Sequence, residues 1–558
     1  MKGVLHRLTS RGGPLASGRM QRMRILMWPV VAAAITPGAA FAAPSDPYVV
    51  YTANRFADGA VVLRTDPRAG TVSEISSNGP QGNLFAAPFD IAVEADGNLL
   101  VADMGTVCTP AQPSCASDGR IIRVDPITGR QSLLAGGAPL VDPAGLAVAP
   151  GGDVYVADNY DSDNNGRVIR IDPVSGARSV VTEGGLLDLP FGILVDRDGS
   201  LVVSNRVSPG GCTTGLAGRL VRVQPAGDTQ QLVSQGPLFR YPLGVALDRA
   251  GRIAFANECG DPGLARVVSD VVQSVLSPNT GGDLLVTPER LALNPSGDFL
   301  VSDWSLGDGD GGIVRVDSAT GAQSLVRQGQ LFNHPIGIDA VVNRPPRARL
   351  ALDPLLVAAG APVRLDASGS RDPEGLRLAY EWDLDGDGTF ERGTAGLAST
   401  TRVWRRNGLR TARVRVNDPH GGRAVAQGVV RVDGSTPQIT GLRAGSRLLG
   451  VGPRRGRGGR PATARRARRA PPRATTIRFR LSERAGVRVT VRRAASRNSS
   501  GRVLAKTGRG GLNKLRVRAR GLRPGRYRLT FEATDAVGHE ATPRSLVLRV
   551  VRLARFAS

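Results

Sequence analysis

The stretch Pro143-Ala-Gly-Leu-Ala-Val148 decides how this chain folds, together with the segments Val154-Tyr-Val-Ala-Asp158 and Arg167-Val-Ile-Arg-Ile-Asp172 that follow it. Each segment is short and apolar, and turn residues separate one from the next, which is typical of consecutive antiparallel β-strands. The turn Asp172-Pro-Val-Ser-Gly176 leads into a further strand, because Pro fixes φ and Gly accepts a positive φ. One copy of the pattern therefore predicts a sheet of four short strands.

The same pattern recurs along the chain, and this repetition is the strongest signal in the sequence. The prolines that open the copies are spaced 46–55 residues apart, at Pro88, Pro143, Pro190, Pro242, Pro288 and Pro335. Four short strands in each repeat correspond to one blade of a β-propeller. Tyr48–Ser76 supplies strands two to four without a first strand, and Pro335–Val342 supplies a first strand with nothing after it. These ends complete one blade, so we predict a closed six-bladed ring over residues 46–342 with no free sheet edge.

The pattern P-x-G-[IL]-A-V, followed by strands ending in Asp or Asn, resembles the NHL-type six-bladed propellers. That superfamily includes gluconolactonase-like enzymes and streptogramin lyases, so the resemblance implies the fold and leaves the activity open. Gluconolactonase-like enzymes hold a metal with Asn or Asp directly after the proline. The corresponding residues here are Phe89, Ala144, Phe191, Leu243, Glu289 and Ile336, and only Glu289 could be a ligand. Streptogramin lyases use a channel histidine and glutamate, whereas this propeller has the single histidine His334.

In such a ring the start of strand one and the end of strand two lie on the same face, around one mouth of the central channel. The strand-two ends are Asn54, Asp103, Asp158, Asn205, Asn257 and Asp303. Their oxygens could hold a divalent cation, but a residue type that recurs in every blade is more simply a cap for a loop. Departures from the repeat are better candidates for ligand contacts at this mouth, namely Arg55, Asp90, Arg206, Glu258, Glu289, Arg290 and Trp304.

All four cysteines lie in loops between the second and third strands. Cys108 and Cys115 share one loop, and Cys212 and Cys259 lie in the loops of successive blades, so we expect the disulfides Cys108–Cys115 and Cys212–Cys259. A zinc site is the alternative, but no C-x-x-C spacing supports it.

Two of the same loops are acidic and rich in glycine. They contain Asp161, Asp163 and Asn165 in the first loop, and Asp308 and Asp310 in the second. The first has the D-x-D-x-N-G form of a calcium-binding loop, but it lacks the glutamate that completes such sites. A solvated turn and a weak calcium site both remain open, and calcium is the one cofactor that the sequence suggests.

Residues 1–42 have the features of a secretory signal peptide. Arg19, Arg22 and Arg24 precede the apolar run Ile25–Ile35, and Ala40-Phe-Ala42 offers a cleavage site. No later apolar run has the length of a membrane span. We therefore expect a secreted protein, one that can also be associated with the cell surface.

Residues 345–432 resemble a PKD domain, an immunoglobulin-like β-sandwich. The motifs that carry the resemblance are Asp366-Ala-Ser-Gly-Ser370, Tyr380-Glu-Trp-Asp383 and Val414-Arg-Val-Asn-Asp418. Trp382 is expected in the core, and domains of this family act as spacers and binding modules. Asp383, Asp385 and Asp387 again resemble a calcium loop, but Thr394 stands at the twelfth position, which favours a plain turn.

Residues 436–553 alternate apolar residues with arginine, which predicts a second sandwich with a cationic surface. The stretch Leu522–Gly538 resembles bacterial immunoglobulin- and fibronectin-type modules, and residues 453–474 are expected to be a disordered Arg-rich insertion. Residues 435–558 carry a formal charge of +28, against −9 for residues 43–434. An anionic cell-wall polymer or envelope surface is the expected partner of this region. Nucleic acid is disfavoured as a partner, because the insertion has no aromatic residue to stack on bases. The alternative is that the arginine content reflects coding bias and has no specific partner.

The sequence thus predicts an all-β protein, a six-bladed β-propeller plus two immunoglobulin-like β-sandwiches. Its 41% hydrophobic and 22% charged residues are typical of globular domains. We expect an exported bacterial protein that binds a ligand or partner at the propeller mouth, with the sandwiches as spacer and surface attachment. The alternative is a metal-dependent hydrolase or lyase that acts at the same mouth.

Overall fold

The structure is a computed structural model. It describes residues 46–55, 60–80, 82–105, 118–159, 166–207, 218–259, 263–269, 272–279, 283–307, 309–329, 331–393, 397–452, 470–494 and 501–553. Every regular element in these ranges is a β-strand, which confirms the predicted all-β class. In the same ranges no helix has the length and apolar character needed to cross a membrane. The predicted signal peptide lies outside the described residues.

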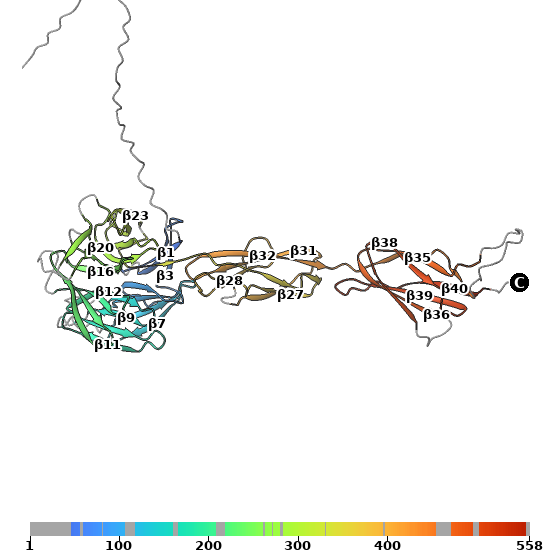
Figure 1. The fold of residues 1–558 in the computed structure, drawn as a ribbon, viewed down its shortest axis with the longest axis horizontal. Coiled ribbons are helices and arrows are strands. Elements are labelled where there is room, and N and C mark those ends of the chain that lie inside the picture. The colour runs from blue at the N-terminus through green and yellow to red at the C-terminus, as the bar shows by residue number, and fades with distance from the viewer. Residues whose placement is uncertain are drawn as a thin grey trace, which may run out of the picture. The chain divides into compact units, whose positions relative to one another are not determined.

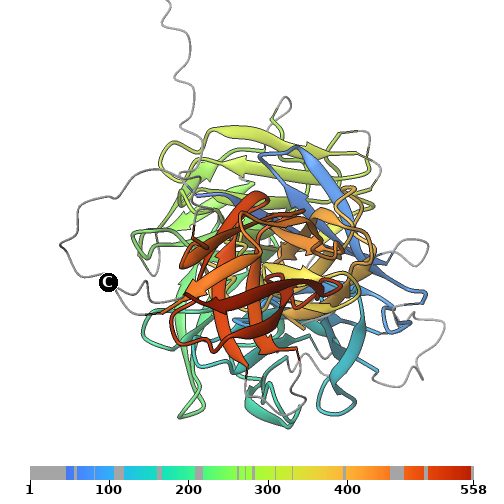
Figure 2. The ribbon, with the colours of Figure 1, turned by 90° about the vertical axis from the view of Figure 1, so that its right-hand side faces the viewer.

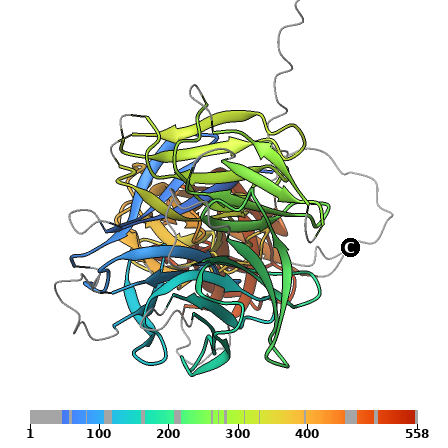
Figure 3. The ribbon, with the colours of Figure 1, turned by 90° about the vertical axis from the view of Figure 1, so that its left-hand side faces the viewer.

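The first half of the chain forms six four-stranded antiparallel sheets that follow one another around a ring (Figures 2 and 3). The sheet that joins the two ends of the array consists of β24 (Pro335–Val342), β1 (Tyr48–Asn54), β2 (Val61–Asp66) and β3 (Thr71–Ser77). The next two sheets consist of β4 (Pro88–Val93), β5 (Leu99–Asp103), β6 (Arg120–Val124) and β7 (Gln131–Gly136), and of β8 (Pro143–Val148), β9 (Val154–Asp158), β10 (Arg167–Ile171) and β11 (Arg178–Glu183). The fourth sheet consists of β12 (Leu189–Val195), β13 (Leu201–Arg206), β14 (Arg219–Gln224) and β15 (Thr229–Gln235). The fifth consists of β16 (Pro242–Leu247), β17 (Ile253–Asn257), β18 (Leu264–Val267) and β19 (Gln273–Ser277). The sixth consists of β20 (Pro288–Leu293), β21 (Phe299–Asp303), β22 (Gly312–Val316) and β23 (Gln323–Gln328).

The ring is closed by its first and last strands. β1 pairs antiparallel with β24, so that Tyr48 lies opposite Val342 and Ala53 lies opposite Gly337. The predicted closure is therefore confirmed, and neither end of the array leaves an unpaired inner edge.

The glycine of the P-x-G pattern allows the innermost strands to approach one another. A Cβ atom on Gly145 would lie 2.0 Å from the carbonyl oxygen of Phe191, and one on Gly192 would lie 2.2 Å from that of Leu243. Both distances are far shorter than a van der Waals contact. The repeat thus keeps glycine at these positions because the neighbouring inner strand occupies the space of a side chain.

In several blades a glutamine at the start of the fourth strand forms hydrogen bonds with the blade before it. Gln131 accepts a hydrogen bond from the amide of Leu84 at 2.8 Å and donates to Ser76 and to the carbonyl of Ser77. Gln230, Gln273 and Gln323 make equivalent contacts in later blades. Three of these side chains, those of Gln131, Gln230 and Gln323, also satisfy amides of half-buried loop residues.

Each of the two following modules has a three-stranded sheet and a five-stranded sheet (Figure 1). The strands of the first module are β25 (Ala351–Asp353), β26 (Leu356–Ala358), β27 (Pro362–Asp366), β28 (Ala379–Asp383), β29 (Arg392–Gly393), β30 (Ser399–Val403), β31 (Gly408–Asn417) and β32 (Arg423–Asp433). The strands of the second are β33 (Ile439–Ala444), β34 (Leu448–Val451), β35 (Ala474–Leu481), β36 (Ala485–Arg493), β37 (Arg502–Gly508), β38 (Gly511–Arg518), β39 (Gly525–Thr534) and β40 (Arg544–Arg552). The strand order is the same in both, including one parallel pair, β26 with β32 and β34 with β40. Trp382 is fully buried in the core of the first module.

The end of the Arg-rich insertion differs from the expected residue 474. β35 already begins at Ala474, and the carbonyls of Pro472 and Arg473 accept hydrogen bonds from Gly450 and Ala519. Backbone hydrogen bonds to the neighbouring strands extend the sheet into the insertion, and the remainder, residues 453–469, lies outside the described residues.

Candidate functional site: the mouth of the propeller channel

The floor of the candidate site is built by the residues that directly follow the repeat prolines. Five of the six are apolar and pack together as one buried cluster: Phe89, Ala144, Phe191, Leu243 and Ile336. The sixth is Glu289 on β20, which is 6% exposed. One carboxylate therefore stands in an otherwise apolar ring at the centre of the propeller.

Above this floor lies a pocket of about 510 Å³. Its lining consists of Arg55, Phe89, Met104, Phe191, Arg206, Glu258, Thr287, Glu289, Trp304 and Ile336. The pocket thus brings together five of the candidates from the sequence, which are Arg55, Arg206, Glu258, Glu289 and Trp304. Its volume lies within the range of about 300–1,000 Å³ that is usual for small-ligand sites.

Arg206, the last residue of β13, is held in place on three sides. Its guanidinium lies 3.7 Å from the ring centroid of Phe191 and 3.5 Å from that of Tyr241, and its Nη2 donates to Glu258 Oε2 at 2.5 Å. Burial lowers the pKa of Arg206 to about 10, although Glu258 opposes this shift. Arg206 and Glu258 together form a fixed polar wall of the pocket.

Glu289 is the carboxyl of the pocket whose pKa is strongly shifted. Burial raises the pKa of its carboxyl to about 7, and the nearby Arg290 opposes the shift only in part. Within the described residues its carboxylate has Coulombic neighbours but no hydrogen-bond partner. A group with these properties can accept a hydrogen bond from a ligand or exchange a proton near neutral pH.

Trp304, which directly follows β21, forms one wall of the pocket, and His334 packs against it. Their rings stack with centroids 4.6 Å apart and an interplanar angle of 24°. His334 Nδ1 also lies 3.1 Å from the carbonyl oxygen of Trp304. Since the histidine is engaged behind the tryptophan and does not line the pocket, it supports the wall.

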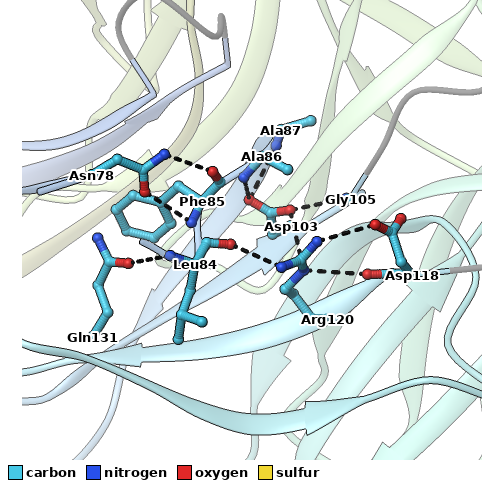
Figure 4. Close-up of polar contacts among 10 residues, drawn as sticks. All are labelled: Asn78, Leu84, Phe85, Ala86, Ala87, Asp103, Gly105, Asp118, Arg120 and Gln131. Carbon is cyan, nitrogen blue, oxygen red and sulfur yellow. Dashed lines mark hydrogen bonds and ion pairs between the residues drawn. The ribbon is translucent and has the colours of Figure 1, made fainter. Parts of the chain in front are cut away.

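The six Asn and Asp residues at the strand-two ends are fully buried, and none of them lines the mouth pocket. Figure 4 shows the arrangement for Asp103, whose carboxylate accepts hydrogen bonds from the amides of Ala86, Ala87 and Gly105. The same type of contact is made by Asp158 with Val141 and Asp142, by Asn257 with Arg240, and by Asp303 with Val286, Thr287 and Ser305. Asn54 and Asn205 donate to the carbonyls of Leu331 and Arg206. In these contacts the side chains hold the loops around the mouth, as the cap interpretation requires.

Asp90 and Arg290 do not lie at the mouth. They line a second pocket, of about 740 Å³, at the other end of the channel. The difference from the expectation follows from the strand geometry, because each residue along an inner strand lies about 3.3 Å further from the mouth. Asp90 and Arg290 stand one residue beyond the floor residues, on the far side of the cluster.

Neither predicted calcium loop can be assigned. Asp161, Asp163, Asn165 and Asp308 lie outside the described residues, and the backbone carbonyl of Asp310 accepts a hydrogen bond from His334. In the described part of the chain, two other groups of side chains are close enough to share an ion: Asp383 with Asp385, Asp387 and Glu391, and Asp433 with Asp535 and His539. Glu391, which the spacing rule for the twelfth position overlooked, joins the first group. Asp383 is already engaged by the amides of Gly386 and Gly388 and by Arg413.

Of the cysteines only Cys259 is described, and it is disulfide-bonded and buried. Cys108, Cys115 and Cys212 lie outside the described residues, so the two predicted pairings stay predictions.

The second sandwich presents cations on the outer face of its three-stranded sheet. Arg478 of β35 lies directly opposite Arg443 of β33 on one side and opposite Lys514 of β38 on the other, and all three side chains are exposed. Like charges placed directly opposite one another repel. The described residues provide no ion pair for this row, whose three cations remain exposed.

Some residues of the site were not anticipated from the sequence. Met104 and Thr287 line the pocket, and Tyr241 covers Arg206. The sequence carried one usable signal for Tyr241, since it directly precedes the repeat proline Pro242 and so stands at the start of an inner strand.

Two family models match the chain. A PKD domain model matches residues 343–432, and an NHL repeat model matches residues 140–168. No curated protein matches the chain. An NHL propeller together with a PKD domain indicates a protein that binds ligands or other proteins, and PKD domains are typical of extracellular proteins.

Solved structures resemble the chain only distantly. The crystal structure of a nidogen/laminin complex matches with a TM-score of 0.40 and 15% identity, over 53% of this chain and 98% of that chain. A protein of unknown function from Bacteroides caccae matches with a TM-score of 0.35 and 14% identity, over 53% of this chain and 99% of that chain. These scores support no argument about function. The chain is therefore identified by its parts, an NHL repeat within a six-bladed β-propeller and a PKD domain at residues 343–432.

Proposed function

We propose that this is an exported bacterial binding protein whose propeller mouth holds a small ligand or a short segment of a partner. The observation that carries the proposal is the 510 Å³ pocket with Glu289 buried and without a hydrogen-bond partner among the described residues. A preformed apolar pocket with a few converging polar groups is the usual form of a ligand site.

The two sandwiches are proposed to act as spacer and attachment. The charge of +28 on residues 435–558 and the exposed Arg443–Arg478–Lys514 row support attachment to an anionic cell-wall polymer or envelope surface. Export rests on the sequence of residues 1–42. Mass spectrometry of the protein recovered from a bacterial culture medium tests it, and we expect the N-terminus at Ala43.

The mouth is tested with a variant that fills it. Thr287 lines the pocket, and its backbone amide, not its side chain, bonds Asp303, so Thr287→Trp should close the pocket and keep the loop. Small molecules and short peptides captured by the wild type, and identified by mass spectrometry, should be lost in this variant. Val286→Trp is the matched control, because Val286 is exposed and lies outside the pocket. Equal capture by Thr287→Trp would move the site elsewhere.

An enzyme acting at the same mouth is the second candidate, and the raised pKa of Glu289 favours it. A carboxyl with a pKa of about 7 suits a general base or acid at neutral pH. Turnover of lactones or polysaccharides, measured with and without divalent metals and abolished by Glu289→Gln, would establish this function in place of binding. Disulfide pairing and calcium binding in the loops remain proposals that ion and disulfide analysis of the purified protein can test.

A further inference from the structure

We infer that the mouth takes a small amphoteric ligand, such as a short peptide, with an ammonium group at Glu289, a carboxylate at Arg55 and an apolar body between them. The inference rests on the proposed function and specifies the chemistry of the same pocket.

The carboxylate of Glu289 lacks a hydrogen-bond donor among the described residues, and a ligand can supply one. This carboxylate is 6% exposed, faces the pocket, and has no hydrogen-bond partner among the described residues. A buried carboxylate in this state is costly unless a partner arrives. The two nearby arginines interact with Glu289 only through their charge. Their hydrogen bonds go elsewhere, from Arg206 to Glu258 and from Arg290 to the carbonyl of Ala144 at 2.7 Å. The group that best satisfies Glu289 is therefore an ammonium brought by the ligand.

Arg55 supplies the opposite charge at the edge of the pocket. Its guanidinium lies 5.2 Å from the ring centroid of Phe89 and forms no ion pair with any carboxylate in the described residues. It is only partly buried, so it meets a ligand before Glu289 does. A guanidinium presents a planar set of donors that matches a carboxylate.

The rest of the pocket lining is mostly apolar. Phe89, Met104, Phe191, Trp304 and Ile336 line it, and the only other polar lining is Thr287 and the Arg206–Glu258 pair. A ligand with two opposite charges and an apolar body would match this set of groups. A simple anion would leave Glu289 without a donor, and a simple cation would leave Arg55 without an acceptor.

The test measures calorimetric binding of the dipeptide Phe-Ala to the full chain, beside N-acetyl-Phe-Ala and Phe-Ala amide, which each lack one charge. We expect the free dipeptide to bind at least about tenfold more tightly than either blocked form, since each lost charged hydrogen bond is worth that much or more. Glu289→Gln should abolish only the preference over the acetylated form, and Arg55→Gln only the preference over the amide. Glu74→Gln and Arg130→Gln, two exposed positions outside the pocket, are the matched controls.

Equal binding of all three peptides, no binding of any, or preferences unchanged by both variants would overturn the inference. If other compounds are still captured by the wild type and lost in Thr287→Trp, the proposed function stands while the amphoteric ligand is rejected. Thermal unfolding of each variant, measured in parallel, excludes loss of binding through loss of the fold.

Discussion

Arg290 Nε lies 3.7 Å from Asp90 Oδ2, and the two residues face each other inside the propeller channel from blades that are not adjacent in sequence. Both stand at the repeat position where four other blades have glycine, at residues 145, 192, 244 and 337. The carboxylate of Asp90 also accepts hydrogen bonds from the amides of Ile91 and Leu146, and Arg290 donates a hydrogen bond to the carbonyl of Ala144. The pair therefore replaces the glycines of the other blades with two side chains that face each other, and its hydrogen bonds connect three blades.

Asp90→Ala should destabilise the propeller by about 3–5 kcal/mol, because it leaves the guanidinium of Arg290 buried without its counter-charge. The double variant Asp90→Gly with Arg290→Gly restores the residue of the other blades and should lose less than the sum of the single changes. Differential scanning calorimetry of the full chain measures both. Additive losses would show that the two side chains do not depend on each other.

Glu289→Gln should change how stability depends on pH. The pKa of Glu289 is raised to about 7 in the folded protein from 4.5, so its contribution is fully present below about pH 4.5 and is lost as the pH rises through 7. The variant lacks this titration and should gain stability relative to the wild type by a few kcal/mol between about pH 5 and 8. The difference between the two proteins is the quantity to measure, because the pKa values of Asp339 and Asp418 are also raised, to about 6 and about 7. A difference that stays constant with pH contradicts the assignment.

Gly145→Ala should disrupt the contact between the second and third inner strands, since its Cβ would overlap the carbonyl of Phe191. Overpacking of this kind costs about 1–3 kcal/mol or more. Gly151→Ala is the control, because nothing lies within 4 Å of a Cβ there and its φ is not positive. Urea unfolding should show a lower midpoint for the first variant and an unchanged one for the second.

Replacing Arg443, Arg478 and Lys514 by Gln should weaken retention on purified cell walls. The row is exposed and without ion pairs in the described residues, and its field is screened over about 8 Å at physiological ionic strength. Retention of the wild type should therefore fall steeply with added salt, and that of the triple variant should be lower at every salt concentration. Retention that does not depend on the salt concentration would show that another part of the chain attaches the protein.

The blades and the closure of the ring could be predicted because four short strands in each repeat and a recurring proline leave little choice of fold. The glutamine contacts between blades were overlooked, although Gln131-Ser, Gln273-Ser and Gln323-Ser recur at the same point of the repeat. A polar residue at a strand start reads as solvent-exposed until the preceding blade is placed beside it. The function of a repeated position depends on its neighbours in space, which a single repeat does not contain.

Only part of the candidate site could be predicted, because a single repeat shows the face on which a residue lies but not its neighbours in space. Arg55, Arg206, Glu258, Glu289 and Trp304 share one pocket, because residues next to a strand end reach the same face of the ring. Asp90 and Arg290 were placed at the wrong depth, since a repeat pattern gives the strand and its direction but does not show where the apolar floor divides the channel.

The pairing of β1 with β24 also has a consequence for biosynthesis. Synthesis of β1 ends at Asn54, but its partner β24 is complete only at Val342. At about 5–20 residues per second this interval is on the order of tens of seconds, during which the apolar strand Tyr48–Asn54 has no inner neighbour. The nascent chain must therefore be protected from intermolecular strand pairing until its last blade arrives, and a ribosome that stalls before Pro335 releases an open, aggregation-prone ring.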